Sequence, residues 1–286
     1  MRTDSARGVA AMFICVAAFS CMDALLKLLS GHYPPLQVAS LRGAASLPFV
    51  LLPLAWSGRL HELRPTRPWL HLLRAALGVI MLGTFVMALR SGSLGSVYAI
   101  YMAAPLLIVA LAALLLGEHV DLGRWLAVLA GLAGVLVILQ PSAGGVTLGS
   151  GLAAIVSALC YAFAAITARL LTRTDSSASM VFSFLAALAI VAGLLALPQW
   201  RPVAPQHGLL IAAVGLLGWL GQHFITEAFR HAPASTVAPI EYTALLWGIG
   251  IDRIFWKTSP ALHVLAGAAL VIGAGLYVAG RERRSR

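Results

Sequence analysis

The chain contains 286 residues, of which 60% are hydrophobic and only 10% are charged; its mean hydropathy is +0.91 and its formal net charge is +10. Soluble domains carry about 25% charged residues, so this composition excludes a water-soluble domain and indicates that lipid surrounds most of the chain. The basic residues fall mainly between apolar runs, which favours membrane orientation signals over a nucleic-acid partner.

Five apolar runs fill the first half of the chain, and each is long enough to cross a bilayer as a helix. They cover residues 8–30, 36–56, 69–89, 95–116 and 122–139. Breaks rich in glycine, proline and serine separate them, such as residues 31–35 and 91–93. We expect the first run to be a retained helix rather than a signal peptide, because further spans follow it.

Five more apolar runs fill the second half, at residues 149–171, 178–197, 208–229, 235–255 and 261–280. A bilayer offers no partner to exposed backbone amides, and runs of about 20 residues are too long for barrel strands. The sequence therefore predicts an all-α, polytopic membrane protein with ten transmembrane helices and short loops.

The distribution of Lys and Arg predicts the orientation of these helices. With ten spans, both termini lie on one side, together with 14 of the 20 Lys and Arg residues; 5 lie on the other side and Arg42 is in mid-span. Cytoplasmic loops carry an excess of Lys and Arg, so we expect both termini in the cytoplasm.

The two halves resemble each other at a nearly constant separation. Residues 88–90 (Ala-Leu-Arg) match residues 228–230 (Ala-Phe-Arg), and residues 27–29 (Lys-Leu-Leu) match residues 169–171 (Arg-Leu-Leu). We therefore expect one repeat at residues 1–143 and a second at residues 144–286. Because each repeat has an odd number of helices, the second must be inverted relative to the first. Inverted repeats place a substrate site near the midplane and support alternating access.

Ionisable residues inside a span usually face the bundle interior or an aqueous cavity. Asp23 and Lys27 are four residues apart on one helix face, an order that favours an ion pair between them. The pair could bind a zwitterion or a proton. Alternatively it is structural, or Lys27 extends to the membrane interface. Arg42 is interpreted as structural, paired with a carboxylate or with carbonyl groups.

Two further groups of residues are candidates for substrate binding. His223 and Glu227 recur at helical spacing with Trp219 and Arg230 on the eighth helix, and they could bind substrate or relay protons. An interhelical hydrogen-bonded core is the alternative interpretation.

The fourth and ninth helices carry the second group, which consists of Tyr98, Tyr101, Glu241 and Tyr242. Their aromatic rings with polar tips suit a cavity for amino acids or aromatic solutes. Pro105 and Pro239 interrupt the hydrogen bonding of these two helices, which is tolerated beside a cavity. Packing, and an interfacial position for Tyr98, are the alternatives.

The chain resembles the EamA-type ten-helix exporters of the drug/metabolite transporter superfamily over nearly its whole length. The resemblance rests on the two five-helix halves, on Arg42, and on the Leu116-Gly117-Glu118 ending before a fifth helix with Gly131 and Gly134. The second half departs from this pattern, because residues 256–258 (Trp-Lys-Thr) stand where that ending should recur. The resemblance implies metabolite export across the bacterial inner membrane, and it extends to the amino-acid exporters, including those for aromatic amino acids.

The main hypothesis is a secondary exporter of amino acids or related small metabolites. A multidrug exporter of lipophilic cations is the alternative, although Lys27, Arg42 and His223 add positive charge that disfavours cations. A membrane-embedded enzyme or a structural subunit is a further alternative, but no G-x-S-x-G, H-E-x-x-H or P-loop motif occurs in the sequence. We expect no catalytic residue, metal or cofactor.

Small residues in the fifth and tenth helices permit close helix contacts, and a homodimer is one arrangement that would use them.

Overall fold

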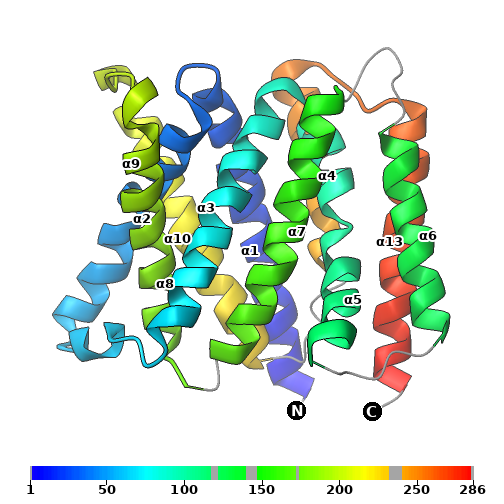
Figure 1. The fold of residues 1–286 in the computed structure, drawn as a ribbon, viewed down its shortest axis with the longest axis horizontal. Helices are drawn as coiled ribbons and strands as arrows, with labels where there is room; N and C mark the ends of the chain where they lie inside the picture. Colours follow the sequence, from blue (N-terminus) through cyan, green and yellow to red (C-terminus); the bar gives the residue numbers. More distant parts are fainter. Residues whose placement is uncertain (1, 117–121, 140–146, 172–173, 232–239, 285–286) are drawn as a thin grey trace.

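The computed structural model describes residues 2–116, 122–139, 147–171, 174–231 and 240–284. Within these ranges the protein is a bundle of helices without strands, and the helices run between two faces (Figure 1). The first and last described residues lie at the same face (Figure 1). We call it the terminal face, and we call the other the opposite face.

The first half contains helices whose starts follow from local sequence. Pro35 and Pro68 stand at the first positions of α2 and α3, where the missing backbone N–H is not needed. Ser93 caps α4, because its side chain accepts a hydrogen bond from Ser96 N at 3.1 Å. The elements are α1 (Arg2–Ser30), α2 (Pro35–Trp56), the 3₁₀ turn η1 (Leu60–Leu63), α3 (Pro68–Ser91), α4 (Leu94–Tyr101), α5 (Ala104–Leu116) and α6 (Leu122–Ile138).

The second half has more irregular helices, with two π-helical turns. Lys257 adopts a left-handed conformation (φ 55°) and ends the second of these turns. The elements are α7 (Leu148–Leu171), α8 (Ser177–Ala187), η2 (Leu188–Ala192), α9 (Gly193–Ala196), η3 (Leu197–Gln199), η4 (Pro205–His207), α10 (Gly208–His231), α12 (Thr243–Ile251), η5 (Asp252–Trp256) and α13 (Leu262–Arg284).

The predicted all-α membrane fold is confirmed. Seven helices of the described chain are long and apolar enough to cross a membrane, and two shorter apolar helices, Trp125–Ile138 and Leu262–Val278, accompany them. Each of the ten predicted runs is helical over its described part. The start of the ninth run, with Pro239, and the Gly117-Glu118 ending lie outside the described residues.

The fourth and ninth helices are interrupted at equivalent positions. Met102 and Ala103 separate α4 from α5, because Pro105 lacks the N–H that would bond to the Tyr101 carbonyl. Tyr242 forms a turn just before α12 and interrupts the regular helix there, although its own φ and ψ angles (−63° and −19°) stay in the right-handed helical region. Met102 and Tyr242 are 140 residues apart, the separation of the internal repeat.

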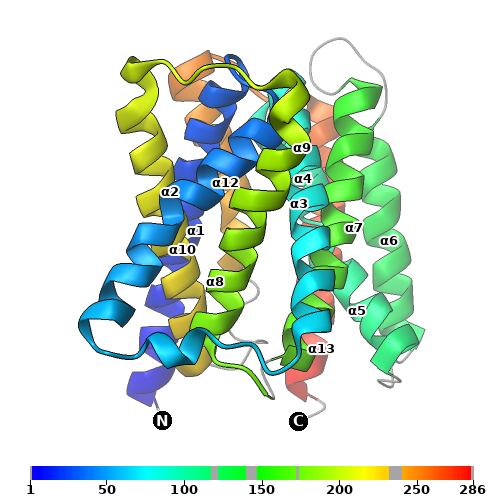
Figure 2. The ribbon, with the colours of Figure 1, turned by 60° about the vertical axis from the view of Figure 1, so that its left-hand side comes forward.

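The contacts between helices follow an inverted two-fold relation. α1 begins at the terminal face, whereas α7 begins at the opposite face (Figure 1). The most extensive contacts join the two halves: α1 with α10, α3 with α7, and α6 with α13. If each helix is replaced by its counterpart in the other half, the α1–α10 contact becomes the α7–α3 contact, and the α6–α13 contact becomes itself. A two-fold axis in the membrane plane requires this relation. In addition, α2 is inclined against both α8 and α10 (Figure 2).

Small residues allow α6 and α13 to approach closely. A Cβ atom on Gly267 would lie 2.5 Å from the Gly134 carbonyl oxygen, and one on Gly134 would lie 2.8 Å from the Gly267 carbonyl oxygen. This use of glycine joins the fifth and tenth helices within one chain. Gly273, on the same helix as Gly267, has open space around it, and a homodimer stays a proposal.

We predict that Gly267→Ala destabilises the protein, because the new methyl group meets a backbone carbonyl that cannot move away alone. Overpacking of this kind costs about 1–3 kcal/mol. Gly273→Ala is the matched control and should be nearly neutral, because nothing lies within 4 Å of its added Cβ. The measurement is unfolding in detergent micelles, and equal effects of the two substitutions would contradict the packing described here.

A carboxylate at the terminal face joins the two halves outside the membrane-spanning segments. Asp175 accepts hydrogen bonds from Thr66 N (2.7 Å) and Thr66 Oγ1 (2.5 Å), and from Thr174 Oγ1 (2.6 Å). His71 Nε2 lies 2.9 Å from Asp175 Oδ1 and donates to it, because a carboxylate only accepts. Burial favours the neutral acid, but the hydrogen bonds from Thr174, Thr66 and His71 outweigh it and hold the pKa of Asp175 well below its usual range.

Asp175→Asn should lower the unfolding temperature. The asparagine side chain brings an NH₂ group, which only donates hydrogen bonds, into a site where Thr66, Thr174 and His71 already donate. The pKa of Asp175 is lower in the folded than in the unfolded chain, so its stabilising effect is complete above the unfolded pKa of about 4. We therefore expect a constant difference from wild type between pH 5 and 8 that shrinks as the pH falls below about 4. A difference that grew at acidic pH would contradict this assignment.

Candidate functional site

A buried ion pair joins the two halves near the opposite face. Lys27 Nζ in α1 lies 2.9 Å from Asp252 Oδ1 at the start of η5, with side-chain exposures of 12% and 1%. Asp252 Oδ2 accepts the Gly95 backbone N–H at 2.8 Å, and the Lys27 ammonium lies 4.3 Å from the centre of the Trp256 ring. Both carboxylate oxygens therefore have a donor, which a buried ion pair requires to offset its desolvation.

This geometry corrects the predicted pairing of Asp23 with Lys27. Asp23 instead accepts a hydrogen bond from the Tyr98 hydroxyl at 2.7 Å, and both residues are buried. Each charged group thus has a partner on another helix. Asp252 was missed by the sequence analysis, although it lies inside the predicted ninth run, where an ionisable residue is a candidate by position alone.

Arg42 in α2 is buried, with only 6% of its surface exposed. Its charge interacts with that of Asp23, and Tyr101 is also within electrostatic range. However, its Nε atom has no hydrogen-bond partner, and no ion pair or hydrogen bond joins Arg42 to any carboxylate in the described part of the chain. The structural pairing expected for Arg42 is therefore not found among the described residues, and its Nε donor is unused there.

Aromatic rings continue from Asp23 toward the terminal face. Phe85 stacks on Tyr98 with ring centres 6.3 Å apart, and Tyr101 lies 5.5 Å from Phe85 and 5.4 Å from Tyr161. The Tyr101 hydroxyl lies 3.9 Å from the Met81 sulfur. Tyr98 and Tyr101, both in α4, thus lie close to Asp23 of α1, the first through a hydrogen bond and the second within electrostatic range.

Glu241 and Tyr242 lie at the equivalent break of the ninth helix. Glu241 is half-buried and within electrostatic range of Tyr101, Tyr161 and Tyr242. The Tyr242 ring is packed against Gly275 of α13, and its buried hydroxyl has no hydrogen-bond partner in the described chain. Polar groups of both halves, Tyr101 and Glu241, therefore lie within electrostatic range of each other, and their role in substrate binding stays a prediction.

His223 and Glu227 lie apart from this cluster, on the peripheral helix α10. His223 is exposed and stacks on Trp219 with ring centres 5.8 Å apart. Glu227 Oε2 lies 3.2 Å from His231 Nε2, one turn nearer the terminal face. The side chain of Arg230 is outside the described residues. A role of His223 and Glu227 in substrate binding stays a prediction.

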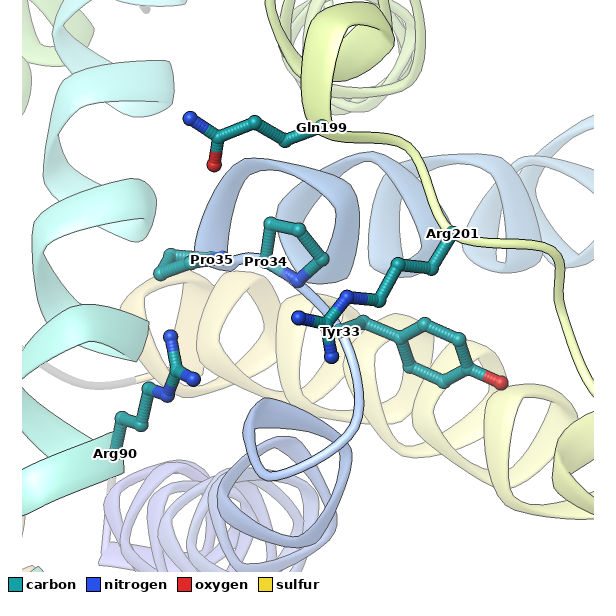
Figure 3. Close-up of a pocket in the computed structure, with 6 residues that line it drawn as sticks. All are labelled: Tyr33, Pro34, Pro35, Arg90, Gln199 and Arg201. Atoms are coloured by element: carbon teal, nitrogen blue, oxygen red, sulfur yellow. The ribbon is translucent and has the colours of Figure 1, made fainter.

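Two hollows open at the opposite face. The first has a volume of about 380 Å³ and is lined by six residues, which Figure 3 shows: Tyr33, Pro34, Pro35, Arg90, Gln199 and Arg201. The second, of about 660 Å³, shares Arg90 with the first and reaches Lys27 and Trp256. Lys27 of the Lys27–Asp252 pair therefore lies at the edge of the second hollow. No group of three or more metal-ligating side chains occurs among the described residues.

An inverted helical bundle with buried charges at its centre and an entrance at one face defines a membrane transporter. The EamA-like transporter family model matches residues 6–140 and 149–280, and the chain belongs to this family. A solved structure described as "Crystal structure of protein" covers 98% of both chains at a TM-score of 0.69 with 22% identity, which supports the fold.

Curated relatives carry the names of transporters for different metabolites. The chain is 30% identical to a riboflavin transporter of Rhizobium johnstonii, over 79% of this chain and 74% of the relative. It is 28% identical to the pseudopaline exporter CntI of Pseudomonas aeruginosa over 93% of both chains. It is 24% identical to an S-adenosylmethionine uptake transporter of Rickettsia conorii, over 97% of this chain and 94% of the relative.

We predict that Asp252→Asn opens the entrance, because it removes the charge that holds Lys27 while keeping an acceptor for Gly95 N. Breaking a buried pair costs about 3–5 kcal/mol, so a closed state held by it should lose at least about tenfold in population. The measurement is labelling of Ser20→Cys by a membrane-impermeant reagent added at the opposite face, with Cys15, Cys21 and Cys160 replaced by serine.

Glu62→Gln is the matched control, because Glu62 forms an exposed pair with Arg59 at the terminal face. It should leave the labelling rate unchanged. A rate that stays at the wild-type level in Asp252→Asn would show that the ion pair does not close this face.

Proposed function

We propose that this transporter exports amino acids or related small metabolites across the bacterial inner membrane by alternating access, with both termini in the cytoplasm. The observation that supports the substrate class most strongly is the adjacency of two opposite buried charges. The described structure contains no direct bond between Asp23 and Arg42, although their charges interact. A zwitterion has one group for each: an ammonium for Asp23 and a carboxylate for Arg42.

The aromatic surroundings would add specificity to this site. Phe85, Tyr98 and Tyr101 offer flat apolar surfaces beside the two charges, and such rings suit aromatic or apolar amino-acid side chains. The names of the relatives cover riboflavin, pseudopaline and S-adenosylmethionine. They support transport of small metabolites in general, and the choice of amino acids rests on the two charges.

The same aromatic rings favour a second candidate, an exporter of lipophilic cations. A cation would bind between Asp23 and the faces of these rings. Arg42 opposes this function, because a buried guanidinium beside the carboxylate repels a permanent cation.

Coupling to protons is compatible with either candidate. Asp23, Glu227 and Glu241 are the intramembrane carboxylates that we propose as proton carriers, because such groups commonly form proton relays. The sequence has no P-loop, which argues against transport driven by nucleotide hydrolysis within this chain.

Transport by purified protein in liposomes tests this proposal. We expect exchange of labelled amino acids, stimulated by a pH gradient, and little uptake of tetraphenylphosphonium. Arg42→Gln and Asp23→Asn should each reduce exchange by more than about tenfold, because each leaves the other charge buried without a ligand. Glu62→Gln is again the control and should transport normally.

The outcomes separate the candidates. Transport of tetraphenylphosphonium that requires Asp23 and is improved by Arg42→Gln would favour the cation exporter. Exchange of amino acids that survives both substitutions would contradict the assigned site. Exchange of riboflavin in place of amino acids would retain the transporter and reject the substrate class.

A further inference from the structure

The opposite face carries more positive charge than its own acidic residues balance. Asp252 is the acidic residue at this end of the described chain, and both of its carboxylate oxygens are already engaged by Lys27 and Gly95 N. The cations that remain there are Arg90, Arg201, Arg253 and Lys257. An uncompensated basic surface around a hollow raises the local concentration of anions.

Two of these cations face a common hollow. Arg90 comes from the last turn of α3, and Arg201 comes from the segment between η3 and η4. Figure 3 shows both guanidinium groups turned into the hollow of about 380 Å³. Arg201 Nη1 donates to the His32 carbonyl at 3.0 Å, whereas Arg90 makes no hydrogen bond or ion pair with the described residues. No carboxylate lines the hollow.

The backbone that carries Arg201 is held in place before any ligand arrives. The buried Gln37 side chain donates to the Arg201 carbonyl at 2.6 Å and accepts from Arg201 N at 3.0 Å. A few residues further on, the Tyr33 hydroxyl accepts from Ala204 N at 3.0 Å and lies 2.7 Å from His207 Nδ1. A fixed wall of this kind lowers the entropy cost of binding.

Two guanidinium groups that share a hollow repel each other, and an anion bound between them would offset this electrostatic repulsion. The planar fork of an arginine matches the two oxygens of a carboxylate or a phosphate. We propose that Arg90 and Arg201 form an anion-binding site at the entrance, which takes the carboxylate or phosphate group of an organic anion. The anion would be either a soluble metabolite or the headgroup of an anionic lipid. This site is separate from Asp23 and Arg42 and does not depend on the proposed substrate.

The position of the site gives it a consequence for the transporter. Arg90 also lines the second hollow, which extends to Lys27. An anion bound at Arg90 therefore stands near the ammonium that pairs with Asp252. It would weaken that pair by offering Lys27 a second negative partner.

Stability measurements on the whole protein test the site. In a neutral detergent at constant ionic strength, replacing chloride by inorganic phosphate should raise the unfolding temperature of wild type, because a ligand of the folded state stabilises it. Arg90→Gln and Arg201→Gln should each weaken the affinity for phosphate by about tenfold or more. Arg90→Gln removes no hydrogen bond or ion pair within the described chain, so its effect on folding should be small.

Arg253→Gln is the matched control, because it removes the same charge from the same face while its guanidinium is bonded to Ser259 Oγ outside the first hollow. It should respond to phosphate as wild type does. A second arm adds phosphatidylglycerol or phosphatidylcholine to the same samples. Stabilisation by phosphate identifies a soluble anion, and stabilisation by phosphatidylglycerol alone identifies a lipid headgroup, provided that Arg90→Gln abolishes it. No stabilisation in either arm, or an equal loss in Arg253→Gln, would overturn the proposal.

Discussion

The ion pair between Lys27 and Asp252 is a buried charge contact between the two halves, and the proposed alternation of the two faces depends on it. It joins α1 of the first half to η5 of the second, and the Gly95 amide ties α4 to the same carboxylate. In a low-dielectric interior, such a contact is stable only when all its members are satisfied. Partial opening would leave a buried charge without a partner. The proposed alternating access would therefore use two arrangements of this contact, one with the pair made and one with both groups in contact with water.

The central polar groups lie beside the interruptions in the fourth and ninth helices, on the terminal-face side of the Lys27–Asp252 pair. Pro105 frees a carbonyl at Tyr101, and a turn at Tyr242 interrupts the ninth helix 140 residues after Met102. Backbone of this kind is tolerated at membrane depth where it lines a cavity or is covered by protein. The substrate site that we propose lies here, because inverted repeats bind their substrates near the midplane between the halves.

The sequence predicted the helical runs and the inversion, and it predicted most of the described boundaries to within a few residues, because lipid imposes one backbone solution and apolar runs are easily counted. The start of α1 at Arg2 lies further from its predicted position at residue 8. The sequence predicted less well which side chains form hydrogen bonds or ion pairs with each other. Asp23 and Lys27 are neighbours on one helix, but side chains from other helices offered better ligands to each. Those ligands, Tyr98 and Asp252, come from positions 75 and 225 residues away along the chain. Helical periodicity cannot choose between such distant partners, and it cannot show that the Nε atom of Arg42 has no hydrogen-bond partner among the described residues.

Distances between spin labels measure most directly whether closure at one face is linked to opening at the other. One pair of labels, at residues 31 and 259, spans the entrance, and a second pair, at residues 7 and 280, spans the terminal face. If the Lys27–Asp252 pair holds one of two arrangements of inverted halves, Asp252→Asn will lengthen the first distance and shorten the second. If the first distance changes alone, or neither changes, the two faces do not alternate through this contact.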